Sequence, residues 1–156
     1  MITRTLQIAH LAETEALGRR LGEVLFPGAV VALIGPLGAG KTHLVRAIAE
    51  GLGILNSRVV NSPTFVLCQE YNARLPIAHF DAYRLKNAHE FADLGVWEYF
   101  EGDGVTLIEW ADRVADVLPA DHLEIVIHPI DIDQRQFVLS AQGMRYQALL
   151  ESLVPA

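Results

Sequence analysis

The spacing of apolar residues changes several times along the chain, and each change predicts a different element. Polar and apolar residues alternate from Thr3 to Ile8, which predicts a short strand near a sheet edge. Apolar residues then recur at helical spacing from Leu11 to Leu25, before Pro27-Gly28 predicts a turn. The run from Ala29 to Ile34 is continuously apolar and is typical of a buried strand.

The second half of the chain continues to change between strand and helix spacing. Val59-Val60 begins an extended piece, and the segments Phe65 to Tyr71 and Ile77 to Tyr83 predict a hairpin. Further expected elements are short helical pieces at 90–94 and 96–100, a strand at 105–110, a helix at 111–118, a strand at 123–127 with a partner at 136–140, and a terminal helix at 144–153. Together these patterns indicate an α/β fold.

A glycine-rich segment between the strand at 29–34 and the next helix fits the phosphate-binding pattern G-x-x-x-x-G-K-[ST] without a gap. It reads Gly35-Pro36-Leu37-Gly38-Ala39-Gly40-Lys41-Thr42. An amphipathic segment with Leu44, Val45, Ile48 and Leu52 follows it, so the order strand, loop, helix is the one that this motif requires. The alternative is an ordinary glycine turn that caps a helix. The segment predicts a site for a nucleoside triphosphate.

The residue types in this loop have a physical reason. Glycines let successive backbone N–H groups converge on an anion, at the positive end of a helix. Lys41 is expected to reach the outer phosphates of the nucleotide. The Thr42 hydroxyl is expected to take one position around Mg²⁺, which prefers octahedral oxygen coordination.

Two carboxylates at the ends of predicted strands are candidates for the same chemistry. Glu109 ends the apolar strand that begins at Val105, as the acid of a Walker B element does, and such an acid lies near the metal beside the loop threonine. Asp81 ends the segment that also carries His79. It either holds a metal-bound water or orients a nucleophile, or it is a turn residue paired with Arg84, and the sequence leaves both readings open.

Length, composition and charge limit the classes of protein to which the chain can belong. A length of 156 residues fits one domain, over residues 1–156, and no apolar run is long enough for a transmembrane helix. Met1 to Ala9 lacks the features of a secretory signal and Cys68 is the single cysteine, so we expect a cytoplasmic protein with no membrane association. The net charge of −7 argues against tight, direct binding of nucleic acid.

Four blocks of residues resemble one known family in both order and spacing. They are Leu37 to Thr42, Asn61 to Phe65, His79-Phe80-Asp81-Ala82-Tyr83-Arg84-Leu85, and Leu107-Ile108-Glu109-Trp110. They are similar to TsaE, the small bacterial ATPase family of tRNA threonylcarbamoyladenosine synthesis. The resemblance runs from about Thr14 to Pro119.

This resemblance implies a fold, a function and a set of site residues. The fold is a P-loop NTPase three-layer sandwich with a mixed, largely parallel central sheet. The function is ATP binding and hydrolysis that supports tRNA modification by the TsaB and TsaD proteins, with contact to tRNA only indirect. The implied catalytic residues are Lys41, Asp81 and Glu109. ATP would contact Thr14 near the base, then Gly38, Ala39, Gly40, Lys41, Thr42, Ser62, Thr64 and Trp110, and Mg²⁺ would be held by Thr42, Glu109 and Asp81.

The chain departs from the usual family pattern at three positions. Pro36 stands where Asp is common, His43 stands where Thr is common, and Ala111 follows Trp110 where the family often has Pro. Pro36 removes one N–H group from the loop. Other functions on the same fold stay open. They are a small-molecule kinase with Asp81 as base, a GTPase, although no N-K-x-D motif occurs, and a nucleotide-dependent adaptor without turnover.

Overall fold

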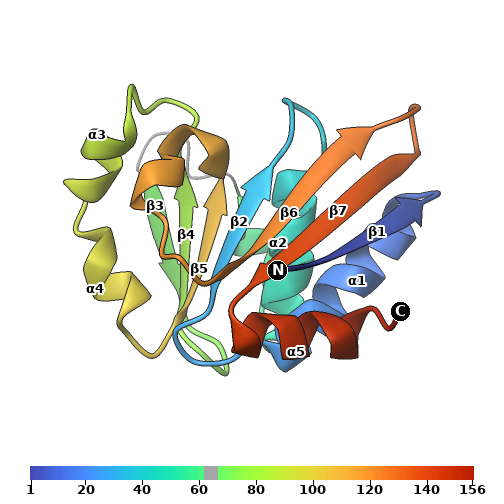
Figure 1. Cartoon of the computed structure of the whole chain (residues 1–156), viewed down its shortest axis with the longest axis horizontal. Coiled ribbons are helices and arrows are strands. Elements are labelled where there is room, and N and C mark those ends of the chain that lie inside the picture. Colours follow the sequence, from blue (N-terminus) through green and yellow to red (C-terminus); the bar gives the residue numbers. More distant parts are fainter. Residues whose placement is uncertain (62–66) are drawn as a thin grey trace.

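The computed structural model describes residues 1–61 and 67–156, in which helices pack on both faces of a seven-stranded sheet (Figure 1). The strands are β1 (Ile2–Ile8), β2 (Val30–Ile34), β3 (Cys68–Tyr71), β4 (Ile77–Asp81), β5 (Val105–Glu109), β6 (His122–Pro129) and β7 (Arg135–Gln142). The helices are α1 (Leu11–Val24), α2 (Lys41–Gly51), α3 (Ala88–Ala92), α4 (Val96–Phe100) and α5 (Met144–Leu153), with 3₁₀ turns η1 (Ser57–Val59) and η2 (Ala111–Val117).

The strand order is β1-β7-β6-β2-β5-β4-β3. Strands β6, β2, β5 and β4 run parallel to one another. Strand β7 pairs antiparallel with both β6 and β1, and β3 pairs antiparallel with β4. The predicted mixed sheet with a parallel centre is therefore confirmed. Because the carboxyl ends of parallel strands meet at one edge, the ends of β2, β4 and β5 lie together there.

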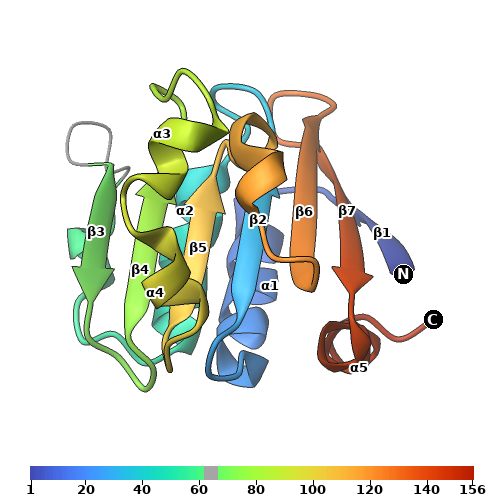
Figure 2. The ribbon, with the colours of Figure 1, turned by 60° about the vertical axis from the view of Figure 1, so that its left-hand side comes forward.

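The two faces of the sheet are covered unequally. Helices α1 and α2 cover one face, and α3, α4 and η2 cover the other face over β2, β5, β4 and the edge strand β3 (Figure 2). The larger apolar cluster combines α1, α2 and α5 with residues from six strands, among them Val31, Leu107, Leu123 and Leu139. The smaller one is built around Phe80, Phe91 and Ile108. This arrangement confirms the expected three layers.

A hydrogen bond to a buried side chain joins helix α5 to the start of β2. The hydroxyl oxygen of Tyr146 accepts a hydrogen bond of 2.9 Å from the backbone N–H of Val30. Tyr146 also packs edge-on against Phe26, with ring centroids 5.0 Å apart. The end of the chain is thereby joined to the strand that leads into the glycine loop.

Most predicted elements are present within a residue or two, and β1 lies at the edge of the sheet as expected. Three differ. Val59 ends the 3₁₀ turn η1, and only Val60 is extended. Leu67 has a φ of 63° and bends the chain before β3, so the first strand of the hairpin begins at Cys68. The helix after β5 is a kinked 3₁₀ segment, with non-helical angles at Val114.

In the described part of the chain, no helix is both long enough and apolar enough to cross a membrane.

Candidate functional site

The glycine loop follows β2 directly and leads into α2. Gly38 and Gly40 have φ values of 77° and 106°, a left-handed conformation that other residues rarely adopt, and Gly40 is the N-cap of α2. A Cβ built on either glycine would meet no atom within 4 Å, so the loop opens onto free space. The backbone of Ala39 closes the turn by donating to the Pro36 carbonyl at 3.1 Å. An open backbone of this kind at a helix N-terminus suits phosphate.

Lys41 is folded back onto this loop. Its Nζ donates to the carbonyl oxygens of Gly35 at 2.6 Å and Pro36 at 2.9 Å, and only 4% of the residue is exposed. Burial lowers the pKa of Lys41, and the nearby carboxylates of Glu109 and Asp81 oppose that shift. The loop therefore holds its own cation in place, close to where phosphate oxygens would lie.

Glu109 and Thr42 meet at the first turn of α2. The Thr42 hydroxyl donates to both carboxylate oxygens of Glu109, at 3.1 and 3.2 Å. Glu109 ends β5, opposite Leu33 at the end of β2, so the parallel pairing brings the acid to the loop that carries the threonine. Thr42 and Glu109, the predicted Walker A threonine and Walker B acid, are therefore in direct contact.

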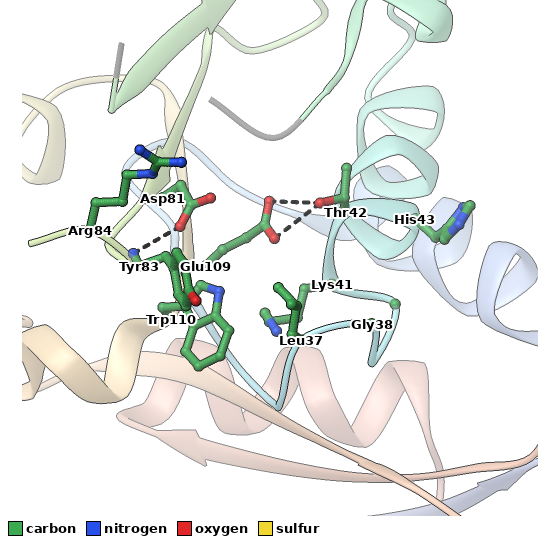
Figure 3. A pocket seen from close by; sticks show the side chains of 11 residues that line it. Leu37, Gly38, Lys41, Thr42, His43, Asp81, Tyr83, Arg84, Glu109 and Trp110 are labelled. Atoms are coloured by element: carbon green, nitrogen blue, oxygen red, sulfur yellow. Dashed lines mark hydrogen bonds between the residues drawn. The ribbon is translucent and has the colours of Figure 1, made fainter. Parts of the chain in front are cut away.

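Asp81 ends β4 directly beside Glu109 in the register of the sheet. Its Oδ1 accepts a hydrogen bond of 2.9 Å from the backbone N–H of Tyr83, and the residue is 5% exposed. Glu109 lies between Asp81 and Thr42, with Arg84 beside Asp81 (Figure 3). Two carboxylates and one hydroxyl thus lie together at the carboxyl edge of the sheet.

Trp110 has a φ of 58°, which is unusual for a bulky side chain. This left-handed residue follows the end of β5 and is the N-cap of η2. Its ring centroid lies 4.2 Å from Lys41 Nζ and 4.8 Å from the ring of Tyr83. Strain of this kind, which costs about 1–3 kcal/mol, is found mainly at functional sites.

These residues enclose a cavity of about 480 Å³ (Figure 3). Its lining combines the loop, the carboxyl ends of β4 and β5, and the residues just after them: Leu37, Gly38, Gly40, Lys41, Thr42, His43, Asp81, Tyr83, Arg84, Glu109 and Trp110. A second cavity of about 240 Å³ lies on the α1 side of the loop and shares three of these residues, namely Gly38, Gly40 and His43. The loop therefore separates two hollows.

The predicted site residues fall into three groups. Gly38, Gly40, Lys41, Thr42, Asp81, Glu109 and Trp110 come together around the larger cavity. Thr14 and Ala39 line the smaller cavity instead, next to Arg135, whose Nε donates to the Ala39 carbonyl at 3.1 Å. The predicted residues Ser62 and Thr64 lie outside the described residues.

Four residues at or near the site are absent from the predicted catalytic, nucleotide-binding and metal-binding sets. His79 lies behind Glu109, while Tyr83, Arg84 and His43 line the larger cavity. His79 could have been identified, because residues two apart on a strand share a face and Asp81 is already a candidate. The contribution of Tyr83 depends on the turn after β4, which periodicity does not predict.

The oxygen donors of Thr42, Glu109 and Asp81 match the preference of Mg²⁺. No group of three or more His, Cys, Asp or Glu side chains is placed to hold a metal ion within residues 1–61 and 67–156. The protein would thus supply only part of the coordination. This is the usual arrangement for Mg²⁺, which keeps several waters and also binds substrate phosphates.

Comparison with known proteins identifies the family. The family described as "Threonylcarbamoyl adenosine biosynthesis protein TsaE" matches residues 8–137, which include the whole site. The chain belongs to the TsaE family. A TsaE from Bacillus subtilis is 46% identical over 142 residues, covering 90% of this chain and 87% of the relative. One from Treponema pallidum is 39% identical over 128 residues, covering 82% and 93%.

A solved structure agrees with this assignment. The crystal structure of Bacillus subtilis YdiB superposes with a TM-score of 0.81 at 36% identity, covering 97% of this chain and 94% of that one. The predicted P-loop fold and the predicted family are therefore both confirmed. TsaE proteins are named for the biosynthesis of tRNA threonylcarbamoyladenosine, so the chain belongs to that tRNA modification system.

Proposed function

We propose that this TsaE-family chain binds ATP with Mg²⁺ and hydrolyses it, slowly alone and faster with the TsaB and TsaD proteins. The main supporting observation is the contact between Thr42 and Glu109, at 3.1 and 3.2 Å. It joins the hydroxyl of the glycine loop to the acid at the end of β5. P-loop ATPases hold the metal with this pair of groups.

Phosphate binding requires Lys41 to move. In the structure its Nζ bonds to the carbonyl oxygens of Gly35 and Pro36. A triphosphate offers anionic oxygens at the same loop, and a charged hydrogen bond to an anion is stronger than one to a neutral carbonyl. Lys41 therefore exchanges its carbonyl partners for phosphate oxygens, and the backbone at Gly38 and Gly40 closes around the phosphates.

The chain's own groups then position the reaction. When bound at Thr42 and Glu109, Mg²⁺ neutralises charge on the phosphate oxygens. Asp81 accepts a hydrogen bond from the attacking water, and its orientation is fixed because Tyr83 N–H already holds Oδ1. The rings of Trp110 and Tyr83 cover this side of the cavity and limit the entry of other water.

The smaller cavity is proposed to receive the adenine end of the nucleotide. Thr14, at 4% exposure, lies there on α1, together with Leu11, His43 and Arg135. Gly38, Gly40 and His43 line both cavities, so one extended ligand that passes over the loop can reach from one cavity to the other. In this arrangement Thr14 lies near the nucleotide base, as proposed from the family resemblance.

The partners follow from the family and from charge. We propose TsaB and TsaD as protein partners, with tRNA contacted by them rather than by this chain. The net charge of −7 supports an indirect role, because tight binding to RNA relies on basic side chains. The single cysteine supports a reducing cytoplasm as the compartment.

The test compares the two lysines of the chain. Lys41→Ala removes the phosphate ligand and is expected to lower ATP hydrolysis, measured with TsaB and TsaD present, by about 100-fold or more. Lys86→Ala, at an exposed position outside both cavities, serves as the matched control and should hydrolyse ATP normally. Normal hydrolysis by Lys41→Ala would overturn the proposal.

An adaptor function differs from the proposed ATPase function in whether ATP must be hydrolysed in each cycle of tRNA modification. If a non-hydrolysable ATP analogue supports many cycles of tRNA modification as well as ATP does, the chain acts as a nucleotide-dependent adaptor. Our proposal predicts that the analogue stops modification after the first cycle. A kinase would instead release a phosphorylated acceptor, with little inorganic phosphate.

A further inference from the structure

One buried histidine in the site is not explained by nucleotide binding. His79 lies on β4, two residues before Asp81, and is 0% exposed. It does not line the larger cavity. In the sheet it stands opposite Leu107, two residues before Glu109. His79 therefore lies directly beneath the two carboxylates, one layer further from the nucleotide.

His79 is bonded to Glu109. Its Nε2 is 2.6 Å from Glu109 Oε2, with the carboxylate 4% exposed. An ionised carboxylate only accepts hydrogen bonds, so the imidazole N–H is the donor, and the Thr42 hydroxyl is the donor on the other side. Glu109 is therefore held between a ring from β4 and a hydroxyl from α2.

The other ring nitrogen of His79 lacks a partner among the described residues. Nδ1 of His79 is buried and makes no hydrogen bond in the described structure. A buried polar atom without a partner lowers stability, and an apolar side chain would pack against Leu107 without that cost. Fold stability alone thus does not account for a histidine here, whereas the bond from Nε2 to Glu109 does.

We infer that His79 is a positioning residue for the metal site. By holding Oε2 of Glu109 it fixes the orientation of the carboxylate, so that both oxygens stay within reach of the Thr42 hydroxyl, at 3.1 and 3.2 Å. Partners of metal-binding carboxylates orient them, and losing such a partner weakens metal binding by about 10–100-fold. The inference rests on the proposed function, because it requires Mg²⁺ at Thr42 and Glu109.

The alternative is a histidine that only fills the core. Two variants separate the readings, because an Asn amide nitrogen occupies the place of Nδ1 and a Gln amide nitrogen that of Nε2. His79→Asn therefore loses the bond to Glu109, while His79→Gln keeps a donor at the right distance. Both place an amide in the same buried position, so they are matched in polarity.

The measurement is the effect of metal on nucleotide affinity. The dissociation constant of a non-hydrolysable ATP analogue is measured in EDTA and in excess Mg²⁺, and the ratio of the two values reports the contribution of the metal. His79→Asn should lower this ratio about 10-fold or more while the value in EDTA stays within about twofold. His79→Gln should restore most of the ratio. A wild-type ratio in folded His79→Asn overturns the inference.

A double-mutant cycle tests whether His79 acts through Glu109. Glu109→Gln alone should lower the ratio strongly, and adding His79→Asn should change it by less than about threefold. Independent, additive losses would show that His79 acts elsewhere and would overturn the inference. A ratio near one in the wild type would instead overturn the metal site, and with it the Mg²⁺-dependent part of the proposed function.

The wild-type chain allows a test that no folding defect can affect. The imidazole N–H of His79 that bonds to Glu109 should give a downfield, slowly exchanging proton resonance, assigned by nitrogen-15 coupling. Glu109→Gln should shift it. If the Nε2 proton exchanges freely with water in the wild type, the bond is absent and the inference fails, whether or not the histidine variants fold.

Discussion

The two halves of the sheet differ in how they are buried. In the parallel half, every residue of β4 and β5 is buried, because helices cover both faces. In the antiparallel half, partly buried residues alternate with exposed ones along β1, since only one face is covered. The chemistry gathers where both faces are covered, at the ends of the fully buried strands.

This difference shows what burial demands of polar groups. At the carboxyl edge of the parallel half, Glu109 is desolvated and is matched by the side chains of His79 and Thr42. At the opposite end of β2, the buried hydroxyl of Tyr146 is matched by a backbone N–H, that of Val30. We therefore expect changes at the first place to alter function, and changes in the antiparallel half and its supports to alter stability.

The largest effect should come from Asp81→Asn. The amide keeps the size of the side chain but is a poor acceptor for the proton of the attacking water, so the turnover number with TsaB and TsaD should fall by about 1,000-fold. The KM for ATP and the melting temperature should change little. Asp103→Asn, at an exposed position away from the site, is the control, and an equal loss there would show that the effect is not local.

A second prediction concerns the antiparallel half. Leu139 on β7 is 0% exposed, and Leu139→Ala should lower the free energy of unfolding by about 3 kcal/mol through lost burial and a cavity. Denaturant unfolding measures this loss. Nucleotide affinity of the folded variant should stay unchanged, and a weakened affinity would contradict the division between the two halves.

A smaller effect is expected from Tyr146→Phe. The change leaves the N–H of Val30 buried without its partner while the ring contact with Phe26 remains, so unfolding should become easier by about 1–2 kcal/mol. The same denaturant titration provides the value. Met144→Ala, at an exposed position of α5, should be neutral. A loss below about 0.5 kcal/mol for Tyr146→Phe would show that water replaces the hydroxyl.

The smallest effect concerns pH. Burial raises the pKa of the Cys68 thiol from 9.0 to about 11. Above pH 9 the unfolded thiol loses its proton first, so the folded state loses stability as the pH rises from about 9 to about 11. Cys68→Ala should lose about 1 kcal/mol less than the wild type between pH 8 and 11, because partial exposure reduces the effect. Parallel pH curves for the two proteins would refute this.

Much of this fold could be predicted from periodicity. Alternation in β1 and β6 reflects one covered face, and the continuous apolar run of β2 reflects two. The loop from Gly35 to Thr42 also follows from the sequence, because its glycines have a local backbone reason. Glu109 could be placed beside Thr42 because the carboxyl ends of adjacent parallel strands meet.

Other features depend on contacts that no local pattern encodes. The spacing of two residues puts His79 on the same face of β4 as Asp81, but its contact with Glu109 follows only from the register of β4 and β5. Thr14 is separated from the larger cavity because the glycine loop lies between them, which depends on how α1 packs. The left-handed Trp110 is a consequence of the turn from β5 into η2, since nothing in its neighbours predicts a positive φ.

Because Trp110 lies beside Lys41, its intrinsic fluorescence can report nucleotide binding. The chain has two tryptophans, and the other, Trp97, is 49% exposed on α4, outside both cavities. Replacing Trp97 with Phe leaves a single indole, 4.2 Å from the Lys41 ammonium. When the nucleotide draws that charge away, the emission of the ring changes. Stopped-flow fluorescence can therefore time the lysine's departure without any attached dye.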